Sequence, residues 1–254
     1  MNRWEGKVAV VTGSASGIGK AITRALLERK IIVVGLDIQN KMEKGTADNG
    51  ENTTNGYYPL RCDISNEKDV DEAFLFVKKK FNGVDIMVNN AGVIDFRRII
   101  ESDGKTFERL LNINVLAMAV CVNRAVRMMR ERNVEGHVFC INSVLGQKLI
   151  YPHFVDLDGY NGWNLYPATK HASVALTHTV RHELCVIKAP IRVTSICPGL
   201  VNSNLISKFE PFTKLMNEFP SLLPEDIADA LVYALGTRPE VQITEITIQV
   251  RGEP

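Results

Sequence analysis

Tyr166 and Lys170 stand four residues apart in a segment of helical period. In a helix this spacing places the phenol and the ammonium on one face, where they can act together. A phenol with a reference pKa of about 10 is a poor base at neutral pH, but a nearby cation favours the phenolate. The pair is therefore a candidate for proton transfer, although a tyrosine and a lysine at this spacing are more often ordinary surface neighbours.

A glycine-rich turn near the start of the chain indicates a second kind of chemistry. The apolar run 7–11 leads into Gly13, Gly17 and Gly19, and a segment of helical period follows. Glycine at 13 permits a tight turn, glycine at 17 lets a pyrophosphate approach the backbone, and glycine at 19 lets the helix pack closely. The amides at the start of that helix would face the anion. By itself the glycine triad is also compatible with a simple tight turn.

Asp37 favours the first of these two interpretations. It ends the next apolar run, 18 residues after Gly19. There its carboxylate can accept hydrogen bonds from the two ribose hydroxyls of an adenosine, and it would repel a 2′-phosphate. The glycines and the carboxylate together predict dinucleotide binding, with NAD preferred to NADP.

Short β-branched runs alternate with longer segments of helical period along the chain. This alternation is typical of a parallel sheet wound with crossover helices. Seven runs are predicted as strands, at 7–11, 31–37, 57–61, 84–89, 136–142, 191–197 and 245–250. Helices are predicted over 19–29, 66–81, 105–132, 166–186 and 224–235. The sequence thus predicts an α/β fold, with a doubly wound seven-stranded parallel sheet and helices on both faces, in one domain of residues 1–254.

The composition excludes several other classes of protein. The chain carries 30 Lys and Arg against 29 Asp and Glu, which leaves no basic surplus for nucleic acid. No signal peptide is recognised, and no apolar run approaches the roughly 20 residues that span a bilayer. The five cysteines are never in a CxxC, as expected for reduced thiols of a cytoplasmic protein. His178 and His182 have no third partner in the pattern, so no metal site is expected.

Five motifs follow one another along the chain. They are Thr12-Gly13-x3-Gly17-x-Gly19, Asn89-Asn90-Ala91-Gly92, Asn114, Ser143 with Tyr166 and Lys170, and Pro198-Gly199. In kind and order they resemble the motifs of the short-chain dehydrogenase/reductase family, over essentially the whole chain. Three segments are most similar to the farnesol dehydrogenase-like branch, which also contains ketosteroid and carbonyl reductases: Arg3-Trp4-x2-Lys7-Val8-Ala9-Val10-Val11, Arg61-Cys62-Asp63-Ile64-Ser65-Asn66-Glu67 and Met129-Arg130-Glu131-Arg132-Asn133-Val134. The resemblance implies a single-domain Rossmann fold and a homodimer or homotetramer.

The resemblance assigns roles to four catalytic residues. Tyr166 would be the general acid/base that exchanges a proton with the substrate oxygen, while hydride passes between carbon and nicotinamide. Lys170 would hold the nicotinamide ribose hydroxyls and, together with the positive charge of the oxidised ring, lower the pKa of Tyr166. Ser143 would hydrogen-bond the reacting oxygen, and Asn114 would anchor a water-borne proton relay.

The resemblance also implies a set of cofactor residues. The full set is Gly13, Ser16, Gly17, Ile18, Gly19, Asp37, Asp63, Ile64, Asn90, Ala91, Gly92, Tyr166, Lys170, Pro198, Gly199, Val201 and Ser203. Asp63 and Ile64 would flank the adenine, and the last four would pack on the nicotinamide end. Simpler explanations exist for some: Asp63 could cap a turn before the next helix, Ser203 could be a loop hydroxyl, and Asn89 is more simply a buried structural amide.

The dipeptide Asp37-Ile38 departs from the branch. Its members usually carry Ala-Arg here, and the arginine holds the 2′-phosphate of NADP. In this chain that cation is absent, and a carboxylate would repel the phosphate, which puts an inherited NADP preference in doubt. NAD as the partner favours alcohol oxidation in a cytosol that keeps NAD largely oxidised.

A second departure lies between Ser143 and Tyr166, whose positions differ by 23, more than in the family pattern. The extra residues fall within 151–163, an aromatic, glycine-containing loop. We expect it to shape an apolar substrate pocket, with a surface or subunit-contact loop as the alternative. The residues expected to form the pocket are Leu145, Tyr151, Tyr160, Trp163 and Leu205.

Together these features predict a cytoplasmic NAD-dependent oxidoreductase that acts on a small hydrophobic secondary or allylic alcohol, or on its carbonyl counterpart. Farnesol-like isoprenoids, retinoids and steroids are the candidate substrates. Two alternatives stay open: an NADP-dependent ketone or carbonyl reductase, and a catalytically silent nicotinamide-binding regulator. Asp37 argues against the first, and the complete set of Asn114, Ser143, Tyr166 and Lys170 argues against the second.

Overall fold

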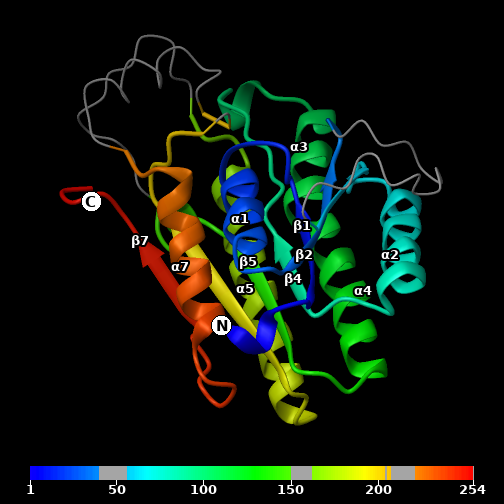
Figure 1. Cartoon of the computed structure of the whole chain (residues 1–254). Coiled ribbons are helices and arrows are strands. Elements are labelled where there is room, and N and C mark those ends of the chain that lie inside the picture. Colours follow the sequence, from blue (N-terminus) through cyan, green and yellow to red (C-terminus); the bar gives the residue numbers. More distant parts are fainter. Residues whose placement is uncertain (40–55, 150–161, 204, 207–220, 254) are drawn as a thin grey trace.

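One parallel sheet organises the chain (Figure 1). The computed structural model describes residues 1–39, 56–149, 162–203, 205–206 and 221–253. Seven strands lie in the order β3-β2-β1-β4-β5-β6-β7. Their bounds are β1 Val8–Thr12, β2 Ile32–Asp37, β3 Tyr57–Arg61, β4 Ile86–Asn89, β5 Gly136–Ile141, β6 Ile191–Pro198 and β7 Glu245–Ile248. The order reverses between β1 and β4, so the sheet is doubly wound, and the predicted fold is confirmed.

Helices cover both faces of this sheet (Figure 1). α1 (Gly17–Leu27) and α7 (Pro224–Gly236) pack on one face, and α2 (Glu67–Phe81), α4 (Ala117–Glu131) and α5 (Tyr166–Val186) pack on the other. Because successive strand residues point to opposite faces, Val10 lies in the core beneath α2, α4 and α5, whereas Val11 lies in the core beneath α1 and α7. Burial on both faces explains why the central strands β1, β2 and β4 show no polar alternation, whereas β7 at one edge of the sheet alternates exposed and half-buried residues.

The helix predicted over 105–132 is interrupted in its middle. α3 (Gly104–Leu111) passes into a π-helical turn, Asn112–Leu116, and then into α4. A single π-helical turn inside a helix often marks a functional site, and this one carries Asn114. By length and composition the stretch Gly104–Glu131 could cross a membrane. Here, however, Cys121, Ala125 and Met129 are buried in the core against the sheet.

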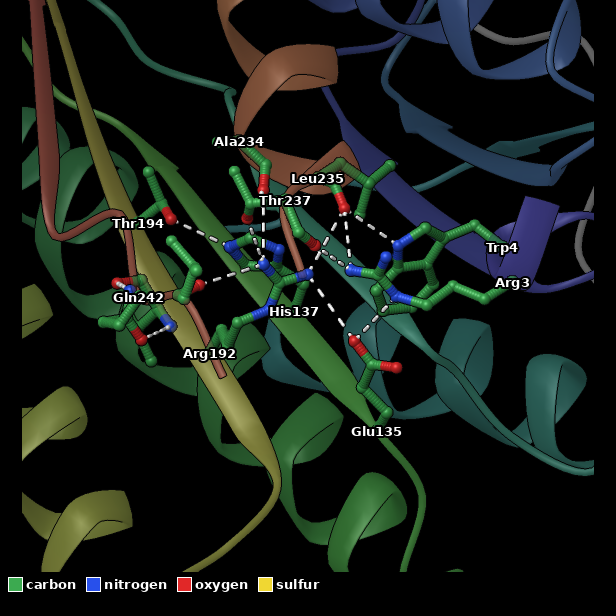
Figure 2. A network of polar contacts seen from close by, with 12 residues as sticks. Arg3, Trp4, Glu135, His137, Arg192, Thr194, Ala234, Leu235, Thr237 and Gln242 are labelled. Carbon is green, nitrogen blue, oxygen red and sulfur yellow. Dashed lines mark hydrogen bonds and ion pairs between the residues drawn. The ribbon is translucent and has the colours of Figure 1, made fainter. Parts of the chain in front are cut away.

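The amino ends of β5 and β6 carry a buried polar network (Figure 2). Trp4 is 1% exposed and donates its indole N–H to the carbonyl of Leu235 at 2.9 Å. Arg3 and Arg192 also donate to this carbonyl, at 3.2 and 3.3 Å, and the carboxylate of Glu135 lies 3.1 and 3.6 Å from the two guanidinium groups. Cations at the last carbonyls of a helix oppose its negative end, so this network fixes α7 against the sheet.

His137 is buried in the same network, beside Arg192 on the next strand. Its ring stacks on Phe139 with centroids 3.9 Å apart, and its Nε2 lies 2.8 Å from the hydroxyl of Thr194. That hydroxyl donates to the carbonyl of Ile243, so it accepts a hydrogen bond from Nε2–H. Burial, and then the charges of Arg192 and Arg3, hold the pKa of His137 well below 6.5.

Candidate active site

A cavity of about 1440 Å³ opens at the carboxyl ends of the strands. Its walls come from the loops that follow β1, β2, β3, β4, β5 and β6, together with the first turn of α5. All predicted cofactor residues except Gly19 line it, and so do Ser143 and three of the predicted substrate residues, Leu145, Trp163 and Leu205. Tyr151 and Tyr160 lie outside the described residues. The fold therefore brings residues from 13 to 205 into one cavity.

Gly19 shapes the cavity from behind its wall. A methyl group at this position would lie 2.1 Å from the carbonyl oxygen of Gly13 and 2.5 Å from Nδ2 of Asn90. No side chain fits in that space, so α1 can approach the turn only with glycine here, as predicted from the sequence. Gly13 itself has φ +67°, which glycine adopts without strain.

Asn90 and Thr12 hold the glycine-rich turn in place. Nδ2 of Asn90 donates to the carbonyl of Thr12 at 2.9 Å. In return, the hydroxyl oxygen of Thr12 accepts from the backbone N–H groups of Asn90 and Ala91, at 3.0 and 3.1 Å. Sequence reasoning did not assign this role to Thr12, although the residue belongs to the quoted motif. Asn89, at the end of β4, is a buried amide whose Nδ2 lies 3.4 Å from the carbonyl of Phe139, as its simpler interpretation predicts.

Asp37 lies at the end of β2 with its carboxylate fixed by two backbone amides. Oδ2 accepts from Ala15 N–H at 3.0 Å, and Oδ1 accepts from Gln39 N–H at 2.9 Å. The residue is only 7% exposed, yet it lines the cavity. A carboxylate offers about four acceptor positions, so each oxygen keeps capacity for a hydroxyl group. Asp63 is used differently: its Oδ1 accepts from the backbone and hydroxyl of Ser65, which is the turn-capping role considered above, while the residue also lines the cavity.

Tyr166, Lys170 and Ser143 line the cavity near β5, whereas Asp37 lines it at the end of β2. In the sheet, β1 and β4 lie between these two strands. Tyr166 begins α5, and Nζ of Lys170 lies 5.6 Å from the centroid of its ring. That ammonium donates to the carbonyl of Ile141 at 2.8 Å. Ser143 follows β5, and its Oγ accepts from Leu145 N–H at 3.1 Å. The expected catalytic trio is thus assembled from β5 and α5.

Burial dominates the protonation of this trio. It raises the pKa of Tyr166 to about 12, and a hydrogen bond with Ser143 opposes that rise. Burial also lowers the pKa of Lys170 to about 8. The sequence predicted that the lysine would lower the pKa of the tyrosine, whereas desolvation of the phenolate is the larger effect in this structure. Tyr166 is therefore protonated and neutral at neutral pH.

Asn114 sits behind the trio, on the π-helical turn. Nδ2 donates to the carbonyl of Val93 at 2.9 Å and to the hydroxyl of Thr169 at 3.0 Å, and Oδ1 accepts from Val93 N–H at 2.9 Å. A small space of about 10 Å³ is lined by Asn114 and Lys170. This is near the smallest volume that holds one water molecule. Thr169, inside the motif that contains Tyr166 and Lys170, was not predicted as a site residue.

Two further parts of the wall were not predicted from the sequence. Arg109 of α3 lines the cavity and pairs with Asp95 at 3.2 Å. The hydrogen bonds of Arg97 to the same carboxylate hold the pKa of Asp95 below its usual value. The C-terminal residues 250–253 also line the cavity. On the apolar side, the ring of Trp163 lies 6.1 Å from that of Phe96, so the described end of the long loop packs on the segment after β4.

Comparisons with known proteins identify the family of the whole chain. The family model for short chain dehydrogenase matches residues 7–213. Farnesol dehydrogenase from Aedes aegypti is 40% identical over 256 residues, which cover 100% of this chain and 99% of that protein. Dehydrogenase/reductase SDR family member 11 from Bos taurus is 35% identical over 260 residues, with 98% of each chain covered. A solved short-chain type dehydrogenase/reductase from Mycobacterium marinum has the same fold, with a TM-score of 0.82 at 24% identity over 97% of this chain and 95% of that one.

Proposed function

Because this chain belongs to the short-chain dehydrogenase/reductase family and is therefore an oxidoreductase, we propose that it transfers hydride between NAD and a hydrophobic secondary or allylic alcohol or the matching carbonyl compound. The observation that carries the proposal is the meeting of Tyr166, Ser143 and Lys170 in the same cavity as the buried carboxylate of Asp37. Similarity to a farnesol dehydrogenase supports an isoprenoid alcohol as the first candidate substrate, beside retinoids and steroids.

The residues present fit a dinucleotide. The cavity is long enough to be lined both by Asp37, the last residue of β2, and by Gly199, which follows β6. Gly17 lines the cavity with φ +49°, which glycine adopts without strain, so a pyrophosphate can approach the backbone of the turn there. The two oxygens of Asp37 keep acceptor positions for ribose hydroxyls, and Tyr166 and Lys170 line the far end. When bound there, the nicotinamide would accept or give the hydride.

Side chains of this protein would transfer the proton. Tyr166 would take the proton from the alcohol during oxidation and return it to the carbonyl oxygen during reduction. With a pKa of about 12 little phenolate is present at neutral pH, so in the working complex the positive charge of the oxidised ring would add to that of Lys170 and favour the phenolate. Ser143 would hold the reacting oxygen, and Asn114 would anchor a water-borne proton relay, since it lines a small space together with Lys170.

The test is the initial rate of nicotinamide absorbance change with NAD or NADP against a panel of isoprenoid, retinoid, steroid and short alcohols. We expect turnover with NAD, and we expect Tyr166→Phe to reduce it by about a hundredfold or more while NAD binding is retained. Tyr233→Phe is the matched control, since that tyrosine is exposed on α7. Retained turnover in Tyr166→Phe would show that the acid/base is misassigned. Turnover only with NADP would favour the reductase alternative, and NAD binding without turnover on any substrate would favour the silent regulator.

We also propose that the protein is a cytoplasmic homodimer or homotetramer. Leu111 and Leu116, on the helix 104–131, are 45% and 58% exposed, and Val186 at the end of α5 is 66% exposed. Apolar side chains on these two helices would be covered by a second copy. All five cysteines are free thiols, which suits a reducing compartment. Light scattering would test the oligomeric state, and cell fractionation would test the cytoplasmic location.

A further inference from the structure

The last residues of the chain return to the catalytic cavity. Residues 250–253 line it together with Tyr166 and Lys170. Glu253 closes a turn, in which its N–H donates to the carbonyl of Val250 at 3.0 Å and Gly252 adopts φ +95°. The side chain of Glu253 then reaches across to the segment that follows β6, where Oε1 accepts from Leu200 N–H at 2.9 Å. Oε2 accepts from Val250 N–H at 3.2 Å.

Gly199 is shaped to receive this carboxylate. A methyl group at that position would lie 2.3 Å from both Glu253 oxygens. No other side chain could therefore occupy position 199 while the carboxylate stays in place. The N–H of Gly199 donates to the carbonyl of Ile248 at 2.8 Å, so β7 and the tail hold two consecutive residues of the segment.

Leu200 is held on both of its backbone groups. Its carbonyl accepts from Leu222 N–H at 2.9 Å, and its N–H is taken by Glu253. The carbonyl of Leu222 in turn accepts from Asn202 N–H at 2.8 Å. The segment 199–202 is thus fixed between two parts of the chain, and Glu253 supplies the charged partner.

We infer that Glu253 is a positioning residue for the nicotinamide half of the dinucleotide. The inference rests on the proposed function, because Pro198, Gly199, Val201 and Ser203 are expected at that half. The carboxylate acts through the backbone: it holds Leu200 N–H, and thereby fixes the orientation of Val201 next to it. Since hydrogen bonds from backbone amides to a carboxylate are stronger than neutral ones, its loss frees the segment on the cavity side.

The test compares NAD with ADP-ribose, which lacks the nicotinamide ring, on the full-length chain. For Glu253→Ala we expect the dissociation constant for NAD to rise about tenfold, equivalent to about 1.4 kcal/mol, and that for ADP-ribose to stay within about twofold of wild type. Glu253→Gln keeps an amide oxygen for Leu200 N–H, so it should recover most of the NAD affinity. Glu240→Ala, at an exposed carboxylate, is the control. In turnover, KM for NAD should rise more than kcat falls.

Two outcomes would overturn the inference. Equal weakening of NAD and ADP-ribose would mean that Glu253 supports the whole fold rather than the nicotinamide half. Unchanged NAD binding in Glu253→Ala would mean that the carboxylate is not needed. A wild-type protein that binds neither compound would contradict the proposed function itself, and with it the inference, so the wild-type measurement separates the two failures.

Discussion

Replacing Asp37 should change which dinucleotide the protein binds. With NAD bound the carboxylate would face ribose hydroxyls, whereas with NADP it would face a 2′-phosphate of the same sign. Two unit charges 4 Å apart interact by about 4 kcal/mol at an effective dielectric constant of about 20. Because Asp37 is 7% exposed but borders an open cavity, we take about half of this, about 2 kcal/mol, as the repulsion that NADP suffers. Its removal would tighten NADP binding about thirtyfold.

The same substitution should weaken the binding of NAD. Asp37→Ala removes a hydrogen bond between a charged acceptor and a ribose hydroxyl, which costs about 1.5 kcal/mol, or about tenfold in affinity. Together the two effects predict that the ratio of NADP to NAD dissociation constants falls by about 300-fold. The backbone N–H groups of Ala15 and Gln39 also lose their acceptor, but that loss affects both dinucleotides alike.

Equilibrium titration of NAD and NADP at fixed ionic strength would measure this ratio. Asp37→Asn is the matched variant, since its amide oxygen still accepts from one backbone N–H while the charge is gone. It should raise NADP affinity nearly as much as Asp37→Ala and lose less stability. In the wild type, added salt should narrow the difference between the two dinucleotides, because the screening length falls to about 3 Å at 1 M. A ratio that changes by less than about threefold in both variants would refute the role assigned to this carboxylate.

Two further predictions concern buried side chains. Asn114→Ala removes the hydrogen bonds to the N–H and carbonyl of Val93 and leaves the hydroxyl of Thr169 with its bond to the carbonyl of Tyr166 alone. The free energy of unfolding should therefore fall by about 2–3 kcal/mol, and an unchanged denaturant midpoint would contradict this. His137 stays neutral in the folded protein, while in the unfolded chain it takes up a proton below about pH 6.5. The free energy of unfolding should therefore fall as the pH drops below about 6.5, and His137 should contribute up to about 1.4 kcal/mol per pH unit to this fall. In His137→Gln the melting temperature should change less between pH 7 and 5 than in the wild type.

The fold could be predicted from the sequence because its strands are buried on both faces. Apolar runs such as β1 and β2 have no polar alternation, and the segments between the strands have a helical period, so their order alone indicates a doubly wound sheet. The π-helical turn at Asn112–Leu116 could not be predicted. One extra residue in a turn barely shifts the apolar pattern of a long helix, so the position of the π-helical turn is visible only in the folded structure.

The site, like the fold, has residues that the sequence predicts and residues that only the structure reveals. The positions of Gly19 at the turn and of Asp37 at the end of β2 could be predicted because both belong to local motifs beside a strand. Glu253 could not be predicted, because its contact with Leu200 joins positions 53 residues apart and depends on the path of the chain after β7. The protonation of Tyr166 was only partly predictable. The spacing to Lys170 indicates an attractive cation, but the depth of burial, which sets the direction of the pKa shift, is a property of the folded site.

The polar groups at the amino ends of the strands, called here the amino edge, differ in role from those at the carboxyl ends, the carboxyl edge. At the amino edge, Arg192 is 5% exposed and its terminal nitrogens donate to carbonyls at the end of α7 and to Thr237 (Figure 2). At the carboxyl edge, Asp37 and Tyr166 line an open cavity and keep hydrogen-bonding capacity for a ligand. Groups that satisfy one another contribute to stability, whereas groups that keep capacity are available for binding. Changes at the amino edge should therefore alter the melting temperature while the dissociation constant for NAD stays the same.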